Sequence, residues 1–207
     1  MDEELIGIFP VPILLTKYTN DISKEFNFIK NLSYINNGNN GNYKSVNTFV
    51  LQSEELKEIN KFIIKSLDIF AKKVLLSNDK LIPTISWTNK NPKGSKHHEH
   101  VHPNSIVSGV FYFSINKSTP IQFHKNDFGG LKLGSESFNT FNRNMYAVNM
   151  ASSELVLFPS TTKHSVPTNT FDDVRYSLSF NTFVSSTVGS VDRLTYLNIK
   201  ELANGNS

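Results

Sequence analysis

The chain has 207 residues, a formal net charge of +3 and no cysteine. The lack of cysteine excludes disulfide frameworks, thiol catalysis and metal sites with cysteine ligands. So small a charge, with no basic run, does not indicate nucleic-acid binding, and no apolar stretch approaches the roughly 20 residues of a membrane span. The acidic start Met1–Glu4 lacks the basic segment of a signal peptide, so we expect a soluble, intracellular protein.

The first 50 residues predict short elements joined by loops. Pro10 and Pro12 favour extended geometry in residues 6–16 and place this strand at a sheet edge. Residues 22–32 form a weak amphipathic pattern that predicts a helix. The asparagine- and glycine-rich residues 36–42 predict a flexible loop.

The clearest helix signal follows Ser53, which we interpret as an N-cap. Glu54 and Glu55 come next, where carboxylates suit the positive end of the helix dipole. Apolar residues then recur at helical spacing and predict one buried stripe, made of Leu56, Ile59, Ile63, Leu67, Phe70 and Val74.

After residue 78 the pattern changes to short β-type runs separated by turn residues. The expected strands are residues 81–88, 106–114, 121–124, 145–149, 154–158 and 174–184. Helices followed by strands indicate a mainly β protein with flanking helices, built as a barrel or jelly roll. We expect a single domain over residues 1–207: helical and edge-strand support in 1–80, the β core in 81–185, and a C-terminal extension in 186–207 that holds a short helix.

Four of the six histidines lie within six positions, at His97, His98, His100 and His102. His100 and His102 are two residues apart, so both imidazoles lie on the same face of an extended segment. Neutral imidazole is the commonest nitrogen ligand for iron, zinc, copper and nickel. His164 is the obvious third ligand, because the intervening strands can return the chain to the same end of a small barrel. His124 is expected to be structural or exposed.

Other ligand sets remain open at this point. His97 and Glu99 also make a His-x-Glu pair, and His98 with His100 is a third possibility. A solvent-exposed histidine tract that binds metal without function is the simplest alternative.

The expected strand 174–184 alternates strictly between polar and apolar residues. Arg175, Ser177, Ser179 and Asn181 face one side, and Tyr176, Leu178 and Phe180 face the other. If helices cover the apolar face, the polar face lines a cavity, where an arginine is costly unless an anion pairs with it. Guanidinium binds carboxylate in a bidentate manner, so a small carboxylate is the natural ligand. Ser108 and Tyr112 of the strand 106–114 offer hydroxyls to the same interior.

The order of the histidine pair, the following strand, the distal histidine and the arginine strand along the chain resembles the 2-oxoglutarate- and Fe(II)-dependent oxygenases. The resemblance is to the prolyl-4-hydroxylase-like branch, and to its bacterial and phage members. The segments that carry the resemblance are His100-Val101-His102-Pro103, Ser108-Gly109-Val110-Phe111-Tyr112, Leu155-Val156-Leu157-Phe158-Pro159 with His164, and Arg175-Tyr176-Ser177. Each segment is weak alone. Together they cover most of the chain, most densely from residue 87 to residue 181.

The resemblance implies a double-stranded β-helix (jelly roll) whose metal ligands are His100, His102 and His164. It implies Fe(II) and 2-oxoglutarate as cofactors, with the C5 carboxylate of 2-oxoglutarate held by Arg175, Ser177 and Tyr112. The expected reaction is hydroxylation of a protein residue or small molecule with O2, releasing succinate and CO2. Most of the superfamily has a carboxylate at the position of His102; three neutral histidines suit zinc, copper or nickel at least as well as iron.

Two other hypotheses compete with the oxygenase. A cupin-like metal-binding barrel of another enzyme class also places clustered histidines on a jelly roll, but it does not require Arg175. A non-catalytic β-sandwich interaction module predicts that His164 lies far from His100. For the oxygenase we expect a cytoplasmic location, in the host-cell cytoplasm if a phage encodes the chain, with no nucleic-acid or membrane partner.

Overall fold

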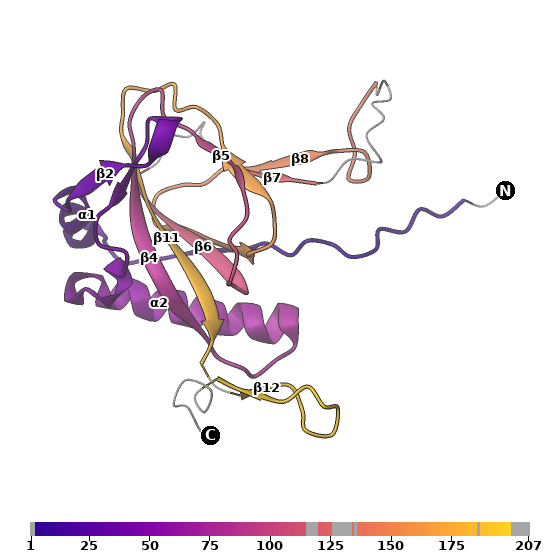
Figure 1. Ribbon diagram of the computed structural model, residues 1–207. Coiled ribbons are helices and arrows are strands. Elements are labelled where there is room, and N and C mark those ends of the chain that lie inside the picture. Colours follow the sequence, from indigo (N-terminus) through magenta and orange to yellow (C-terminus); the bar gives the residue numbers. More distant parts are fainter. Residues whose placement is uncertain (1–2, 115–119, 126–133, 135, 186, 200–207) are drawn as a thin grey trace.

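The computed structural model describes residues 3–114, 120–125, 134, 136–185 and 187–199, and its chain forms two facing antiparallel sheets with helices on one outer side (Figure 1). The large sheet has seven strands in the order β1-β9-β6-β11-β4-β3-β2. Their bounds are β1 Leu14–Lys17, β2 Tyr34–Asn36, β3 Tyr43–Ser45, β4 Leu81–Asn91, β6 Val107–Ser114, β9 Glu154–Pro159 and β11 Arg175–Val184. This arrangement confirms the predicted jelly roll with flanking helices.

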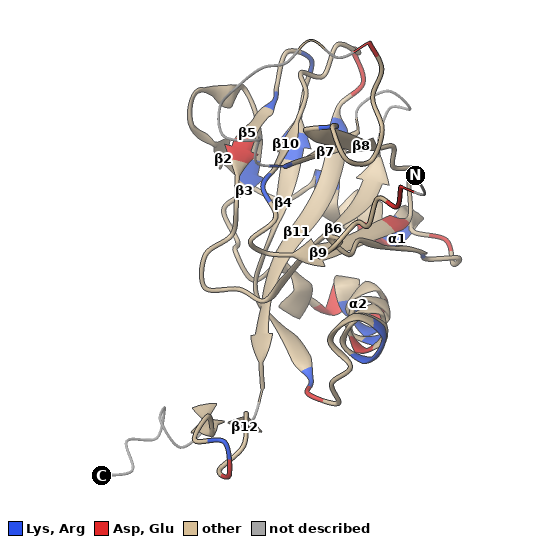
Figure 2. Cartoon of the chain, turned by 90° about the vertical axis from the view of Figure 1, so that its right-hand side faces the viewer, with Lys and Arg blue, Asp and Glu red and all other residues tan. Residues whose placement is uncertain are grey.

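The small sheet has four strands in the order β5-β10-β7-β8. They are β5 His97–His100, β7 Ile121–His124, β8 Met145–Val148 and β10 His164–Val166. Figure 2 shows strands β9, β6, β11 and β4 of the large sheet side by side, with a long helix beneath them. The cavity that contains the histidines opens between the two sheets, on the side away from that helix.

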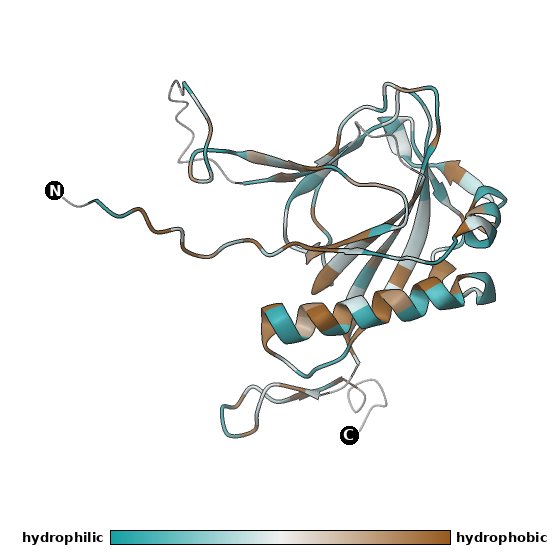
Figure 3. Ribbon diagram, turned by 180° about the vertical axis from the view of Figure 1, so that it is seen from behind, coloured by the Kyte–Doolittle hydropathy of each residue, from teal (hydrophilic) through white to brown (hydrophobic). Residues whose placement is uncertain are grey.

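The helices are α1 Ser23–Lys30 and α2 Lys57–Phe70, with short 3-10 turns at η1 Gly38–Asn40, η2 Val50–Gln52 and η3 Glu54–Leu56 and a π-helical turn at η4 Ala71–Leu75. The predicted stripe is confirmed: Leu56, Ile59, Ile63, Leu67 and Phe70 are all at most 1% exposed, and Val74 is partly buried against the same core. They pack against the apolar face of the large sheet, and the hydropathy colours of Figure 3 show the apolar bands of α2. None of the described helices is long and apolar enough to cross a membrane.

One sequence expectation needs correction: Ser53 precedes the 3-10 turn η3 rather than α2, and its side chain makes no capping hydrogen bond. The predicted loop 36–42 joins the paired strands β2 and β3 and contains the short turn η1. In the C-terminal extension, residues 187–188 and 197–198 form the short strands β12 Thr187–Val188 and β13 Leu197–Asn198, and the short helix expected in this extension stays a prediction, because residues 200–207 lie outside the described residues.

Gly109 of β6 permits the close approach of two core side chains. A Cβ atom at this position would overlap Phe180 of β11 and Leu157 of β9. Gly109→Ala is therefore expected to destabilise the protein by about 1–3 kcal/mol, through overpacking, in urea unfolding. Gly134→Ala is the control, because no atom lies within 4 Å of a Cβ added there. Equal midpoints for the two variants would contradict this account of the core.

Candidate metal centre

Three histidines converge on one point between the small sheet and the start of β6. β10 pairs antiparallel with β5, and this register places His164 directly opposite His100. His102 follows β5 by two residues, and its backbone N–H donates to the carbonyl of Ser160 at 2.9 Å. The ligand atoms of His100, His102 and His164 all lie within 4.8 Å of one another. Short-range alternation thus sets the spacing of the first two imidazoles, and strand pairing supplies the third.

The ring orientations leave suitable nitrogens free. The Nδ1 atom of His100 lies 2.7 Å from the carbonyl of His98, and that of His164 lies 3.0 Å from the carbonyl of Thr162. In each case an Nδ1–H that donates to the carbonyl leaves the Nε2 lone pair available. Phe158 packs against the His164 ring at 4.7 Å between centroids and provides an apolar wall. The hydrogen bonds to the two backbone carbonyls fix the tautomer that metal binding requires.

Burial keeps these imidazoles neutral. It lowers the pKa of His102 to about 4 and the pKa of His164 to about 3, and it also lowers the pKa of His100. Neighbouring histidines add a smaller effect in the same direction. A neutral imidazole is the form that binds a metal ion, so the site is ready to bind at neutral pH.

These lowered pKa values predict how the stability of the metal-free protein depends on pH. The unfolded chain protonates its histidines near pH 6.5, whereas buried His164 stays neutral to a much lower pH. The contribution of neutral His164 to the free energy of unfolding is therefore fully present above pH 6.5. It is lost as the pH falls toward the pKa of His164 in the folded protein. At pH 5 the loss is about 2 kcal/mol for this group, seen as a lower Tm than at pH 7.

A matched pair of variants checks this assignment. His164→Asn should reduce the stability lost between pH 7 and pH 5 by about 2 kcal/mol, while His100 and His102, whose pKa values are also lowered, keep part of the dependence. His98→Asn, at an exposed position in the same cluster, should leave that dependence as in the wild type. A pH dependence as steep in His164→Asn as in the wild type would show that His164 makes no such contribution.

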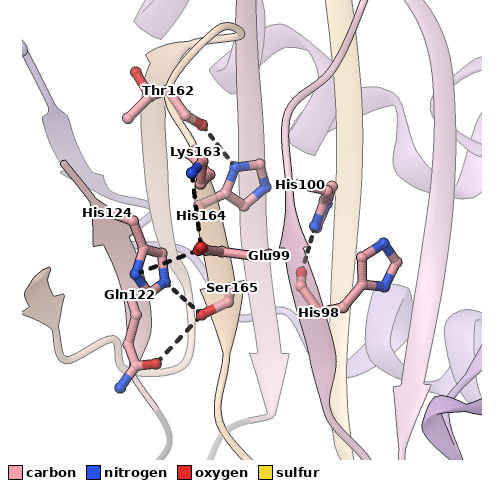
Figure 4. A network of polar contacts seen from close by, with 9 residues as sticks. All are labelled: His98, Glu99, His100, Gln122, His124, Thr162, Lys163, His164 and Ser165. Atoms are coloured by element: carbon pink, nitrogen blue, oxygen red, sulfur yellow. Dashed lines mark hydrogen bonds and ion pairs between the residues drawn. The ribbon is translucent and has the colours of Figure 1, made fainter. Parts of the chain in front are cut away.

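The rival ligand sets are not brought together in the same way. Glu99 points to the opposite side of β5, where its carboxylate lies 3.8 Å from Lys163 Nζ and 3.9 Å from His124 Nδ1 (Figure 4). His97 lies deeper, with Nε2 at 2.7 Å from Asn91 Oδ1. Among the described residues, only His100, His102 and His164 form a group that could hold a metal ion. The centroids of the His100 and His164 rings are 4.3 Å apart, which contradicts the hypothesis of a non-catalytic β-sandwich, because that hypothesis predicted that His164 lies far from His100.

The polar face of β11 lines the same cavity as the histidines. This cavity has a volume of about 380 Å³, and Arg175, Ser177, Ser179 and Asn181 all face it. The opposite face of the strand, with Leu178 and Phe180, is buried in the core above α2. The strict alternation of this strand therefore separates a packed side from a cavity side, as the sequence predicted.

Arg175 is buried without a partner for much of its guanidinium group. It is only 4% exposed, and its Nε and Nη1 atoms make no hydrogen bond with the described residues. Ser177 and Tyr112 face each other across β11 and β6 and are 4% and 2% exposed. Burial raises the pKa of Tyr112 to about 12, so its phenol stays protonated and can donate. Unsatisfied buried donors are costly, and an anionic ligand would remove that cost.

The sequence analysis assigned no role in the cavity to several residues that line it. Trp87 and Asn89 of β4 face it, and Trp87 lies 5.9 Å from the His102 ring between centroids. Asn40 of η1, in the predicted loop 36–42, and Lys44 of β3, just after that loop, also reach the cavity. The alternation of Ile85, Trp87, Asn89 and Asn91 along β4 was the available signal. For β3 the three-residue length offered none.

Comparison with known proteins gives a consistent result. Residues 85–181 match the model of a family described as "Putative 2OG-Fe(II) oxygenase". No curated protein sequence matches the chain. Three solved structures share the fold at low identity.

The first is a 2OG-Fe(II) oxygenase family oxidoreductase from Burkholderia pseudomallei, with 13% identity, a TM-score of 0.56, and coverage of 78% of this chain and 76% of that one. HygX from Streptomyces hygroscopicus, solved with nickel, 2-oxoglutarate and hygromycin B bound, has 12% identity, a TM-score of 0.60 and 84% coverage of both chains. A Pseudomonas putida prolyl-4-hydroxylase has 12% identity, a TM-score of 0.55, and coverage of 82% and 91%. Residues 85–181, which contain the three histidines and Arg175, thus match a 2-oxoglutarate- and Fe(II)-dependent oxygenase family, and the chain has the fold of such oxygenases.

Proposed function

We propose that His100, His102 and His164 hold the Fe(II) ion of this oxygenase. Their ligand atoms converge within 4.8 Å, their pKa values are lowered, and two of the three rings are oriented by backbone carbonyls. Three protein ligands leave positions open for a cosubstrate and O2. When bound, Fe(II) and 2-oxoglutarate supply the oxidation of a substrate C–H bond by O2, with release of succinate and CO2.

We further propose that Arg175, Ser177 and Tyr112 bind the C5 carboxylate of 2-oxoglutarate. The observation that carries this assignment is the unpartnered, 4%-exposed guanidinium of Arg175 in the cavity that also contains the histidines. Its Nε and Nη1 atoms are free to donate, and a carboxylate accepts two such bonds in parallel. Ser177 and Tyr112 add hydroxyl donors from the neighbouring strand positions.

His102 changes the charge of the site. With a carboxylate at this position the ligand set would carry one negative charge, whereas three imidazoles carry none. The metal site is correspondingly more positive, and the protein must select iron through geometry and cosubstrate rather than through ligand charge. The hydrogen bonds from the His100 and His164 rings to the carbonyls of His98 and Thr162 contribute to this geometry, because they fix the orientation of both rings.

The reaction we propose is hydroxylation in the cytoplasm, of either a small molecule or a protein residue. Structures of similar fold include a complex with hygromycin B and prolyl hydroxylases, one of them with a peptide fragment bound. Both substrate sizes are therefore compatible with this fold. The loop around residues 36–42 borders the cavity, and of residues 125–144 the segments 126–133 and 135 lie outside the described residues.

The test is an anaerobic titration of metal-free protein with Fe(II) and then with 2-oxoglutarate. Chelation of the iron by 2-oxoglutarate should give a visible metal-to-ligand charge-transfer band with a stoichiometry of one. Calorimetry in parallel reports the affinity of each component. Tight binding of another metal with no band from iron and 2-oxoglutarate would refute the proposed roles and favour a different metal enzyme on the same fold.

A further inference from the structure

Lys44 extends the cavity lining beyond the proposed cosubstrate site. In the large sheet Lys44 of β3 pairs with Asn89 of β4, and Asn89 pairs with Ser177 of β11. The three residues form one row across the sheet, and all three line the cavity. The adjacent pair, Tyr43 and Lys90, faces the other side, where the Lys90 ammonium lies 5.8 Å from the centre of the Tyr34 ring. Strand alternation therefore directs Lys44 toward the cavity.

Among the described residues, the ammonium group of Lys44 has no counter-charge. Lys44 is half-buried, and within the described part of the chain it makes no hydrogen bond or ion pair. By contrast, Lys57, Lys61 and Lys93 each pair with a carboxylate at the surface. No aspartate or glutamate is among the described residues that line the cavity. The cavity therefore has a positive potential that its own side chains do not balance.

Lys44 and Arg175 approach the cavity from different strands of the large sheet and from different positions along them. β3 and β11 are separated by β4, so their backbones are roughly 10 Å apart at the usual strand spacing. Arg175 also lies opposite Asn91, two residues along β4 from the partner of Lys44. If 2-oxoglutarate neutralises Arg175, the charge of Lys44 remains available for a second anion.

The surroundings of Lys44 connect it to the metal centre. Asn40, at the same side of the cavity, lies 3.0 Å from Nδ1 of His98, and the His98 ring is 5.2 Å from the ring of His100. Trp87 shares the cavity wall and lies beside His102. A molecule held by Lys44 would thus lie against the indole and face the histidines.

We propose that the substrate of this enzyme carries an oxyanion, a carboxylate or a phosphoryl group, that binds to Lys44 with Trp87 flanking the adjoining apolar part. The proposal rests on the proposed function, because it assigns Arg175 to 2-oxoglutarate and Lys44 to the substrate. The three histidine ligands strengthen the preference for an anion, since imidazole, unlike a carboxylate, brings no negative charge to the cavity. Lys44 is a specificity residue in this assignment.

The experiment uses protein loaded anaerobically with Fe(II) and 2-oxoglutarate. Three probes of similar shape are titrated by calorimetry while the visible band is followed: phenylacetate, phenyl phosphate and the neutral phenylacetamide. At least one anion should bind about tenfold or more tightly than the amide, equivalent to about 1.4 kcal/mol. The stronger of the two anions identifies the substrate group as carboxylate or phosphoryl.

Variants assign this preference to Lys44. Lys44→Met should reduce the affinity for the anion to that for the amide, and Lys44→Arg should restore most of it. Lys90→Met, on the opposite face of the sheet, should behave as the wild type. Anion affinity that survives in Lys44→Met, an anion that displaces 2-oxoglutarate, or the absence of saturable binding by either anion would overturn the proposal. If the band never forms in the wild type, the proposed function fails; if it forms in all variants, only the role of Lys44 is at issue.

Discussion

His164→Ala is expected to lower the affinity for Fe(II) by more than about a hundredfold and to abolish O2 consumption that depends on 2-oxoglutarate. Changes in the groups that merely orient metal ligands already cost 10–100-fold, so loss of a ligand should cost more. His164 is also the one member of the triad on β10, and His100 and His102 alone leave a two-ligand site. Metal stoichiometry in anaerobic equilibrium dialysis measures the effect, with circular dichroism to verify the fold.

Variants of the rival ligands serve as controls. His98→Ala and Glu99→Gln should retain one bound Fe(II), because His98 contacts Asn40 and Glu99 faces Lys163 and His124. His97→Ala should also retain the metal, since its ring is held by Asn91 at the Arg175 end of the cavity. Unchanged stoichiometry in His164→Ala, or loss of metal in Glu99→Gln, would transfer the site to another part of the histidine cluster.

The sequence predicted the elements whose side-chain pattern is strong. β7 occupies residues 121–124 as expected, and the alternation of β11 correctly separated the cavity face from the core face. Both strands have one apolar and one polar or partly exposed face, so local periodicity carries the information. The same reasoning identified the stripe of α2, even though the first turn is a 3-10 turn.

The elements that the sequence missed depend on contacts distant in the chain. β5 consists of the residues HHEH and has no apolar alternation, so its strand character comes from pairing with β10. β2 and β3 are three residues each and are stabilised by addition to the edge of β4. Lys44 was missed for this reason, because a residue just after an asparagine-rich loop, in a strand of three residues, carries no local signal of the face that it takes in a sheet.

At the metal site, the sequence motif alone could not decide whether Glu99 is a ligand. The His-x-Glu pair at residues 97–99 has the same spacing as the His-x-His pair at residues 100–102. The register between β5 and β10 decides between them, since it sets His164 opposite His100 rather than opposite Glu99. Strand pairing is a tertiary property, and so only the structure could separate the two alternatives geometrically.

Arg175→Met is expected to weaken 2-oxoglutarate binding while it leaves Fe(II) binding intact. Removal of one partner of a buried charge pair costs about 2–5 kcal/mol, so the Kd for 2-oxoglutarate should rise by at least about thirtyfold. The same change should raise the Tm of the ligand-free protein, because an unpartnered guanidinium at 4% exposure is unfavourable there and methionine is not. Calorimetry and thermal unfolding measure the two effects, and Arg143→Met, at an exposed position, should produce neither.

The opposite signs of these two effects distinguish a binding role from a structural one. If Arg175 stabilised the fold, its loss would lower the Tm and would reduce metal and 2-oxoglutarate binding together. If Arg175 instead binds the carboxylate of 2-oxoglutarate, the Arg175→Met variant should be more stable than the wild type in the absence of ligand. Added 2-oxoglutarate should then stabilise only the wild type, because a ligand stabilises the folded state to which it binds. Arg175→Lys should fall between them, since the ammonium keeps the charge but lacks the planar fork. Equal 2-oxoglutarate affinity in Arg175→Met would show that the carboxylate binds elsewhere in the cavity.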